Sequence, residues 1–261
     1  MTASAAPGTV NTAVADAWAV AGRNLIAYRR VPQLLVFSTI QPVIFVLLFR
    51  YVFGGAITVP GVRYVDYLMP GIFVQTVVFG SIGTAVGLAS DLNAGLIERF
   101  RSLPMARSAV LAGRTTADLV RNVFVVALMA VVGFAVGFRI HAGLAGALAA
   151  VVVVVAFGYA VSWIFATVGL LVGDPETAQA AAFPVMAPLV FASNAFVPLR
   201  SMPGWLQAFA EHQPVSATVS AARALVLGGP TTRPVLKAAA WIVAILAVAA
   251  PLAVRRYRTA A

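Results

Sequence analysis

The sequence predicts an all-α polytopic membrane protein, and three observations lead to this fold class. Of the 261 residues, 61% are hydrophobic and 10% are charged, whereas about a quarter of the residues in a soluble domain carry a charge. The apolar residues form runs of about 20, the length of helix that crosses the hydrocarbon core of a bilayer. Basic residues gather at the ends of these runs, where they fix the orientation of a membrane protein.

Six apolar runs predict six transmembrane helices, over residues 32–53, 68–90, 119–138, 143–172, 177–197 and 235–254. Three of these runs contain proline, which a span tolerates where neighbouring helices satisfy the freed carbonyls. The centres of the runs hold no Asp, Glu, Lys, Arg or His. This pattern argues against a proton-coupled carrier, which needs an ionisable relay inside the membrane.

The arginines predict how the chain is oriented. An even number of spans places both termini on one side of the membrane. Arginines precede the first run, follow the last and are frequent in the second connection, among which Arg114 and Arg121 are counted. The positive-inside rule therefore predicts a multi-pass protein of the bacterial inner membrane with both termini in the cytoplasm.

The composition also argues against several kinds of site. The net charge of +10 would suit a nucleic-acid-binding protein, but the basic residues form no aromatic-interleaved face, so we expect no nucleic-acid partner. The chain has no cysteine, and its two histidines, His141 and His212, have no neighbour at metal-ligand spacing. We therefore expect no metal site and no cofactor in this chain.

Three segments outside the spans have helical patterns of their own. Residues 12–30 repeat apolar side chains at steps of four and three opposite charged ones, which predicts an amphipathic helix on the membrane surface. Residues 96–103 predict a short cytoplasmic helix ended by Pro104. Residues 203–228 predict two short external helices that re-enter the outer leaflet, or pack on the ends of the last two spans, with Trp205 and Phe209 as an external gate.

Small residues and one cap give further local predictions. Glycines at four-residue spacing, such as Gly83 with Gly87 and Gly169 with Gly173, predict close approach between helices. Asp174 followed by Pro175 predicts the N-cap and first turn of the fifth span.

Five short motifs occur along the chain in a fixed order. They are residues 98–104 (ERFRSLP), 175–179 (PETAQ), 191–198 (FASNAFVP), 202–206 (MPGWL) and 213–215 (QPV). In this order and among six spans, they resemble type-2 ABC exporter permeases, and most closely the daunorubicin/doxorubicin-resistance branch. Because the resemblance extends from residue 20 to the end, residues 1–261 are predicted to form one transmembrane domain.

The resemblance implies a transport subunit that is not itself an enzyme. It would form a homodimer with a second permease copy, within membrane lipid, and work with two copies of a separate ABC ATPase that bind ATP and Mg²⁺. The chain has no GxxxxGK(S/T) phosphate loop, which agrees with this arrangement. The coupling segment that would contact the ATPase is Leu96, Ile97, Glu98, Arg99, Phe100, Arg101, Ser102, Leu103 and Pro104.

The resemblance also places the exit path along the second and fifth spans. Polar residues there would orient an amphiphilic drug, natural product or lipid-like cargo leaving the cytoplasm or inner leaflet, while aromatic residues and methionine would give it adaptable apolar surface. Packing against lipid or another helix is the alternative for each aromatic. The residues of the predicted path are Phe73, Gln75, Thr76, Phe79, Phe183, Met186, Ser193 and Asn194, the last standing where many relatives have glycine.

Two other functions are consistent with the residues alone. One is a secondary-active transporter, and the other is a membrane enzyme or an assembly scaffold. An ATPase gene beside the gene for this chain would favour the exporter over both.

Overall fold

The computed structural model describes residue 22 and residues 32–96 and 107–259, and every regular element in these ranges is helical. The elements are α2 (Pro32–Leu47), the π-helix η1 (Leu48–Val52), α3 (Tyr64–Gly80), α4 (Ile82–Asn93), α6 (Arg107–Ala135), α7 (Gly143–Val172), α8 (Pro175–Phe191), the 3₁₀ turn η2 (Leu199–Ser201), α9 (Gly204–His212), α10 (Pro214–Leu227) and α11 (Thr232–Thr259).

Four helical stretches within the described ranges are long and apolar enough to cross a membrane. They are Tyr64–Asn93, Leu111–Ala135, Gly143–Val172 and Thr232–Tyr257. This confirms the predicted class of helical membrane protein. The number of six spans stays a prediction, because the first predicted span is represented by the shorter apolar helix Thr39–Val52 and the fifth by α8, which has 17 residues.

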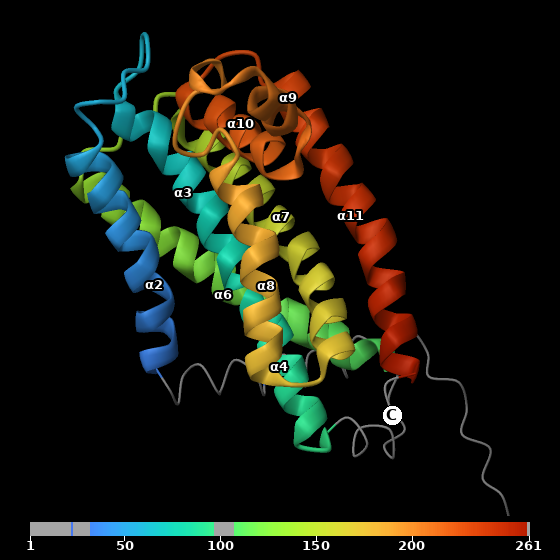
Figure 1. Ribbon diagram of the computed structural model, residues 1–261. Helices are drawn as coiled ribbons and strands as arrows, with labels where there is room; N and C mark the ends of the chain where they lie inside the picture. The colour runs from blue at the N-terminus through green and yellow to red at the C-terminus, as the bar shows by residue number, and fades with distance from the viewer. Residues whose placement is uncertain (1–21, 23–31, 97–106, 260–261) are drawn as a thin grey trace, which may run out of the picture.

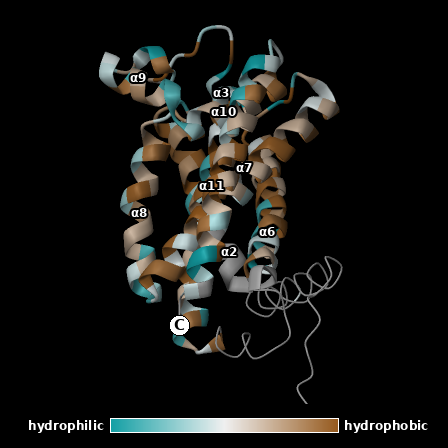
Figure 2. Ribbon diagram, turned by 90° about the vertical axis from the view of Figure 1, so that its right-hand side faces the viewer, coloured by the Kyte–Doolittle hydropathy of each residue, from teal (hydrophilic) through white to brown (hydrophobic). Residues whose placement is uncertain are grey.

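The long helices run between two ends of the molecule. At one end lie α9 and α10, and at the other lie the start of α2, the end of α4 and the end of α11 (Figure 1). Hydrophobic residues cover the middle of α6, α7 and α11, whereas hydrophilic residues are more frequent towards the ends (Figure 2). This distribution is what a bilayer around the middle of the bundle requires.

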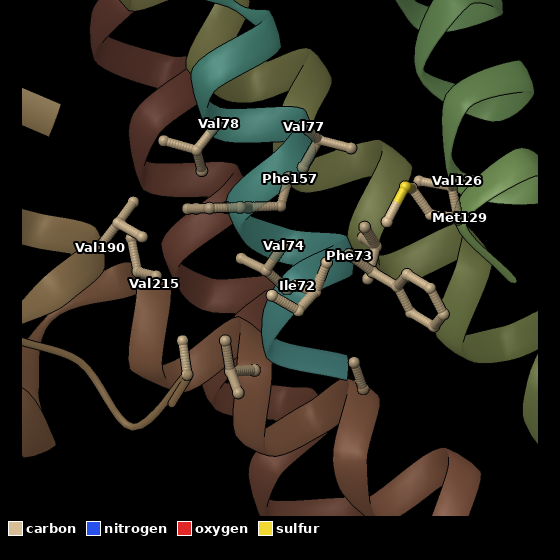
Figure 3. Packing of buried hydrophobic residues seen from close by; sticks show 14 of the residues in the cluster. Ile72, Phe73, Val74, Val77, Val78, Val126, Met129, Phe157, Val190 and Val215 are labelled. Atoms are coloured by element: carbon tan, nitrogen blue, oxygen red, sulfur yellow. The ribbon is translucent and has the colours of Figure 1, made fainter. Parts of the chain in front are cut away.

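Helix α3 forms the centre of the bundle. Its residues from Tyr64 to Val78 are all buried. Figure 3 shows Val77 and Val78 of α3 beside Phe157 of α7, with Met129 of α6 on one side and Val190 of α8 on the other. Since lipid is as apolar as these side chains, close packing rather than exclusion of water holds such helices together.

Two glycines permit that close packing. A Cβ at Gly71 of α3 would overlap the backbone at Ala195, and a Cβ at Gly169 of α7 would overlap the backbone at Ala85. The predicted close approach at Gly169 is therefore confirmed. Its partner in the predicted pair, Gly173, has another role: it follows the end of α7 with a φ of 73°, a conformation that favours glycine.

The second and third predicted spans differ from the structure in their bounds. The second begins at Tyr64 and is interrupted at Ser81, whose hydroxyl donates to the carbonyl oxygens of Val77 and Gly158. The third begins at Arg107 instead of Leu119, so Arg114, Asp118 and Arg121 lie inside α6. The prediction of span centres without ionisable residues is therefore wrong for this helix.

The local predictions around α8 and α10 agree with the structure. The Asp174 carboxylate accepts hydrogen bonds from the hydroxyl and the backbone N–H of Thr177, which lower the pKa of Asp174, and Pro175 is the first residue of α8. Helices α9 and α10 both fall within residues 203–228. The amphipathic helix over 12–30 and the coupling residues 97–104 lie outside the described residues apart from Gly22, so both stay predictions.

Candidate functional site

A lateral groove with a volume of about 710 Å³ opens between α2, α4, α6 and α8. Two residues of the predicted path line it, Phe79 at the end of α3 and Phe183 on α8, and their ring centroids are 5.9 Å apart. Phe183 is half exposed, so the groove is open on its α8 side. The complete lining is Gln41, Phe79, Gly80, Ile82, Gly83, Val86, Gly87, Arg114, Arg121, Gln179, Ala180 and Phe183.

Four other residues of the predicted path are buried away from this groove. Phe73 packs edge-on against Phe138, and the hydroxyl of Thr76 donates to the carbonyl oxygen of Ile72 within its own helix. Met186 is buried in the main core, and Gln75 is buried with its Oε1 atom unpaired. These contacts are those of core residues, as the alternative of ordinary packing predicts for Phe73.

The last two residues of the predicted path, Ser193 and Asn194, belong to a polar cluster after the end of α8. The Ser193 hydroxyl donates to the carbonyl oxygen of Val190. The backbone carbonyl of Asn194 accepts from the Tyr67 hydroxyl at 3.1 Å and from the Arg223 guanidinium at 2.9 Å. Its side-chain amide donates to the hydroxyl of Ser220 at 2.8 Å. Asn194 therefore ties the end of α8 to α3 and α10.

Arg223 of α10 is the centre of this cluster, which we name the Arg223 cluster. Its guanidinium lies 3.5 Å from the centroid of the Tyr67 ring, and its Nε donates to the backbone carbonyl of Tyr67 at 3.1 Å. Both interactions are favourable for a partly buried cation. Nearby, the hydroxyl of Tyr64 donates to the carbonyl oxygen of Phe196 at 2.9 Å. The cluster holds α3, α10 and the segment after α8 together.

Aromatic rings connect the groove to the segment after α8, and the sequence analysis did not identify most of them. The ring of Phe79 lies 6.5 Å from that of Phe191, which is 5.5 Å from that of Phe196. Phe196 stacks on Phe49 with centroids 4.5 Å apart. The four-residue spacing of Phe45, Phe49 and Phe53 was the available signal, because it places the three rings on one face of the first helix.

The wall of the groove opposite α8 carries two arginines of α6. The Arg114 guanidinium donates to the Gly83 carbonyl oxygen at 3.3 Å and lies 3.4 Å from the Asp91 carboxylate. Arg121 is 8% exposed, and a Cβ at Gly80 would lie 2.8 Å from its guanidinium. Sequence reasoning assigned both arginines to membrane orientation. Their spacing of seven residues, which places them on one helix face, was the signal for a different role.

The two residues of the predicted gate are on the surface. Trp205 is 75% exposed and Phe209 is 46% exposed, both on α9. Packing of these rings against the ends of the fifth and sixth spans is therefore not seen within this chain. Contact with the outer leaflet is the part of the prediction that stays open, and a tryptophan at the membrane interface is common.

Comparison with known proteins identifies the family. The model of the ABC-2 type transporter family matches residues 16–227. The chain belongs to the ABC-2 type transporter family. It is 36% identical over 236 residues to the daunorubicin resistance ABC transporter permease protein DrrB1 of Streptomyces coeruleorubidus, covering 90% of this chain and 83% of that protein.

Two relatives from Mycobacterium tuberculosis belong to the same branch. The chain is 31% identical over 253 residues to the probable doxorubicin resistance ABC transporter permease protein DrrC, covering 95% of this chain and 91% of that protein. It is 29% identical over 227 residues to the permease protein DrrB, covering 81% and 78%. The resemblance of this ABC-2 permease to the daunorubicin/doxorubicin-resistance branch is thus confirmed.

Proposed function

We propose that this chain is the membrane-spanning subunit of an ATP-driven exporter that moves an amphiphilic drug, natural product or lipid-like molecule out of the cytoplasm or inner leaflet. The observation that carries the proposal is the open groove at Phe79 and Phe183, with its row of aromatic rings towards the segment after α8, in a chain of the ABC-2 family. Resistance to daunorubicin and doxorubicin, in the names of its relatives, suggests planar amphiphiles as cargo.

The rim of the groove supports action as a pair of permeases. Phe183, Val185 and Phe191 are exposed along α8, and Ile44 of α2 is exposed as well. Side chains of this kind are satisfied equally by lipid or by an apolar protein surface. A second copy packed against α8 would turn the open groove into an enclosed path between two permeases.

The proposed mechanism uses ATP bound to a separate subunit. Association of two ATPase copies on ATP binding would move the cytoplasmic ends of the helices, through the coupling residues 96–104, and narrow the groove. Cargo would then leave the polar wall at Arg114 and Arg121 and pass along the rings of Phe79, Phe191 and Phe196. Such rings contact flat apolar cargo over a large area at little cost in side-chain entropy.

The test is reconstitution of the permease with its partner ABC ATPase into liposomes, with daunorubicin fluorescence as the signal. We expect ATP-dependent movement of daunorubicin that disappears when the phosphate-loop lysine of the ATPase is replaced. A proton uncoupler should leave it unchanged. Movement that persists with the inactive ATPase and stops with the uncoupler would assign the chain to secondary transport instead.

A further inference from the structure

The two arginines of the groove lie against a strip of glycines. Gly80, Gly83 and Gly87 follow one another on the face of α3 and α4 that meets α6. A Cβ at Gly87 would overlap the guanidinium of Arg114, and Cβ atoms at Gly80 and Gly83 would lie 2.8 and 3.3 Å from that of Arg121. The absence of side chains at these three positions is what leaves room for both cations.

Arg121 is the less satisfied of the two cations. It is 8% exposed and its Nε atom is buried without a partner. Among the described residues, its guanidinium makes one hydrogen bond, to the side-chain oxygen of Asn122 at 3.1 Å. Within the part of the chain that the structure describes, no carboxylate lies at ion-pair distance from it. Asp118, one turn earlier, accepts a hydrogen bond from the hydroxyl of Thr84. Arg114, in contrast, forms an ion pair with the Asp91 carboxylate at 3.4 Å.

A buried arginine without an ion-pair partner costs free energy unless an anion binds to it. Charged side chains inside membrane spans are rare, and those that occur mark substrate or ion pathways. A planar guanidinium with free N–H groups binds phosphate, sulfate or carboxylate through paired charge-assisted hydrogen bonds. Arg121 and Arg114 both line the groove, and both guanidinium groups lie at Gly83, so an anionic group between them would be attracted by two cations.

The remainder of the groove determines what the anion is attached to. Phe79, Ile82, Val86 and Phe183 form an apolar surface next to the two cations. Gln41 and Gln179 add neutral hydrogen-bonding groups at the α2 and α8 sides. A free inorganic anion would use the cations and leave the apolar surface uncovered. An amphiphile with an anionic head would use both.

From these contacts we infer that the groove is a binding site for the anionic head of an amphiphile, a phosphate, sulfate or carboxylate held by Arg121 and Arg114, with its apolar part against Phe79 and Phe183. The inference rests on the proposed function and concerns those cargo molecules that carry an anionic head. Daunorubicin, which carries an amine, would use the aromatic wall at Phe79 and Phe183 and not the two guanidinium groups.

The test measures binding and needs no transport. The full chain, purified in a neutral maltoside detergent, is titrated with dodecyl phosphate, dodecylphosphocholine and dodecyltrimethylammonium, and bound ligand is counted by native mass spectrometry. We expect dodecyl phosphate to bind about tenfold or more tightly than the other two, which share its tail. Inorganic phosphate, as a fourth ligand, should bind more weakly than dodecyl phosphate because it lacks the apolar part.

Variants locate the site. Arg121→Gln should abolish the preference for dodecyl phosphate, whereas Arg200→Gln, which removes an exposed charge outside the groove, should keep it. Gly80→Ala keeps every charge but moves the Arg121 guanidinium, so it should weaken dodecyl phosphate binding without changing dodecylphosphocholine binding. Gly80→Ala also serves as the informative variant if Arg121→Gln fails to fold.

Three results would overturn the inference. The first is equal binding of the three dodecyl ligands by the wild-type chain, which is also the result expected if a carboxylate of a second copy neutralises Arg121. The second is a preference that persists in both Arg121→Gln and Gly80→Ala. The third is inorganic phosphate binding as tightly as dodecyl phosphate. None of these depends on ATP, so a failed transport assay with intact binding would contradict the proposed function alone.

Discussion

Two arginines of this permease occupy opposite environments. Arg223, on α10, has two backbone carbonyls as acceptors and an aromatic ring beneath its guanidinium. Arg121, in the groove, has one side-chain oxygen and a buried Nε without a partner. A satisfied buried cation holds a structure together, and an unsatisfied one is available to a ligand. The Arg223 cluster is therefore a structural feature of the molecule, and the groove is its candidate binding site.

Replacement of Arg223 is the strongest test of the difference between the two arginines. Arg223→Met loses two charge-assisted hydrogen bonds and the contact with the Tyr67 ring. The Asn194 carbonyl oxygen then accepts one hydrogen bond fewer. We expect the free energy of unfolding to fall by about 3–5 kcal/mol. Reversible unfolding in mixed detergent micelles measures it. Arg223→Lys keeps the charge but loses the planar guanidinium, so its free energy of unfolding should lie between those of the wild type and Arg223→Met. Wild-type stability of Arg223→Met would remove the structural assignment.

Gly71→Ala tests the packing next to the Arg223 cluster without changing a charge. The new methyl group would overlap the backbone at Ala195, which cannot rotate away as a side chain does. We expect a loss of about 1–3 kcal/mol in the free energy of unfolding, the usual effect of overpacking. Gly55→Ala is the matched control, because no atom lies within 4 Å of a Cβ at Gly55. Equal stability of the two variants would contradict the close approach of α3 to the segment after α8.

Arg121→Met should behave in the opposite way from Arg223→Met. Replacement of an unpaired buried charge by an apolar side chain of similar length should leave the free energy of unfolding unchanged or raise it by about 1 kcal/mol. Export of an anionic amphiphile should fall, since the groove loses one of the two cations that line it. Unfolding in micelles and efflux per folded molecule are measured on the same preparation. A large loss of stability would show that Arg121, like Arg223, is a structural cation.

Phe183→Ala tests whether the ring of Phe183 in the groove wall contacts the cargo. The Phe183 ring is half exposed, so its removal should change the free energy of unfolding by about 0.5 kcal/mol or less. We expect efflux of daunorubicin to fall through a higher half-saturating concentration, because a ring that contacts cargo is lost. Phe124→Ala, on an exposed face of α6 outside the groove, is the aromatic control. Similar efflux by both variants would place the cargo elsewhere.

The smallest effect on stability is expected at Trp205. The side chain is 75% exposed on α9, so Trp205→Ala should leave the free energy of unfolding within about 0.5 kcal/mol of the wild type. If Trp205 is an external gate, efflux per folded molecule falls in Trp205→Ala and is kept in Trp205→Phe. Normal efflux in both variants, with lower abundance of Trp205→Ala, would identify the residue as an interfacial anchor.

The sequence by itself determined the class and many of the local elements of this protein. Long apolar runs predicted a helical membrane protein, and α7 begins and ends at the predicted residues, Gly143 and Val172. Asp174 and Pro175 predicted the start of α8, and the turn residues after it predicted the two short helices α9 and α10. These signals are local, since a cap or an apolar run acts on residues within a few turns of itself.

Only the tertiary structure decided what the buried polar residues do. The hydropathy pattern assigned Arg114 and Arg121 to a cytoplasmic connection, because charged residues interrupt the apolar run. In the structure the helix starts at Arg107 and continues through both arginines. Whether a charge within a helix is buried depends on the opposing face, here the glycine strip at Gly80, Gly83 and Gly87, about 30 to 40 residues earlier in the chain. Likewise Asn194 was predicted to line the cargo path, but α3 and α10 converge on it and make it part of the Arg223 cluster. Such roles come from residues that are distant in sequence, and therefore no local pattern contains them.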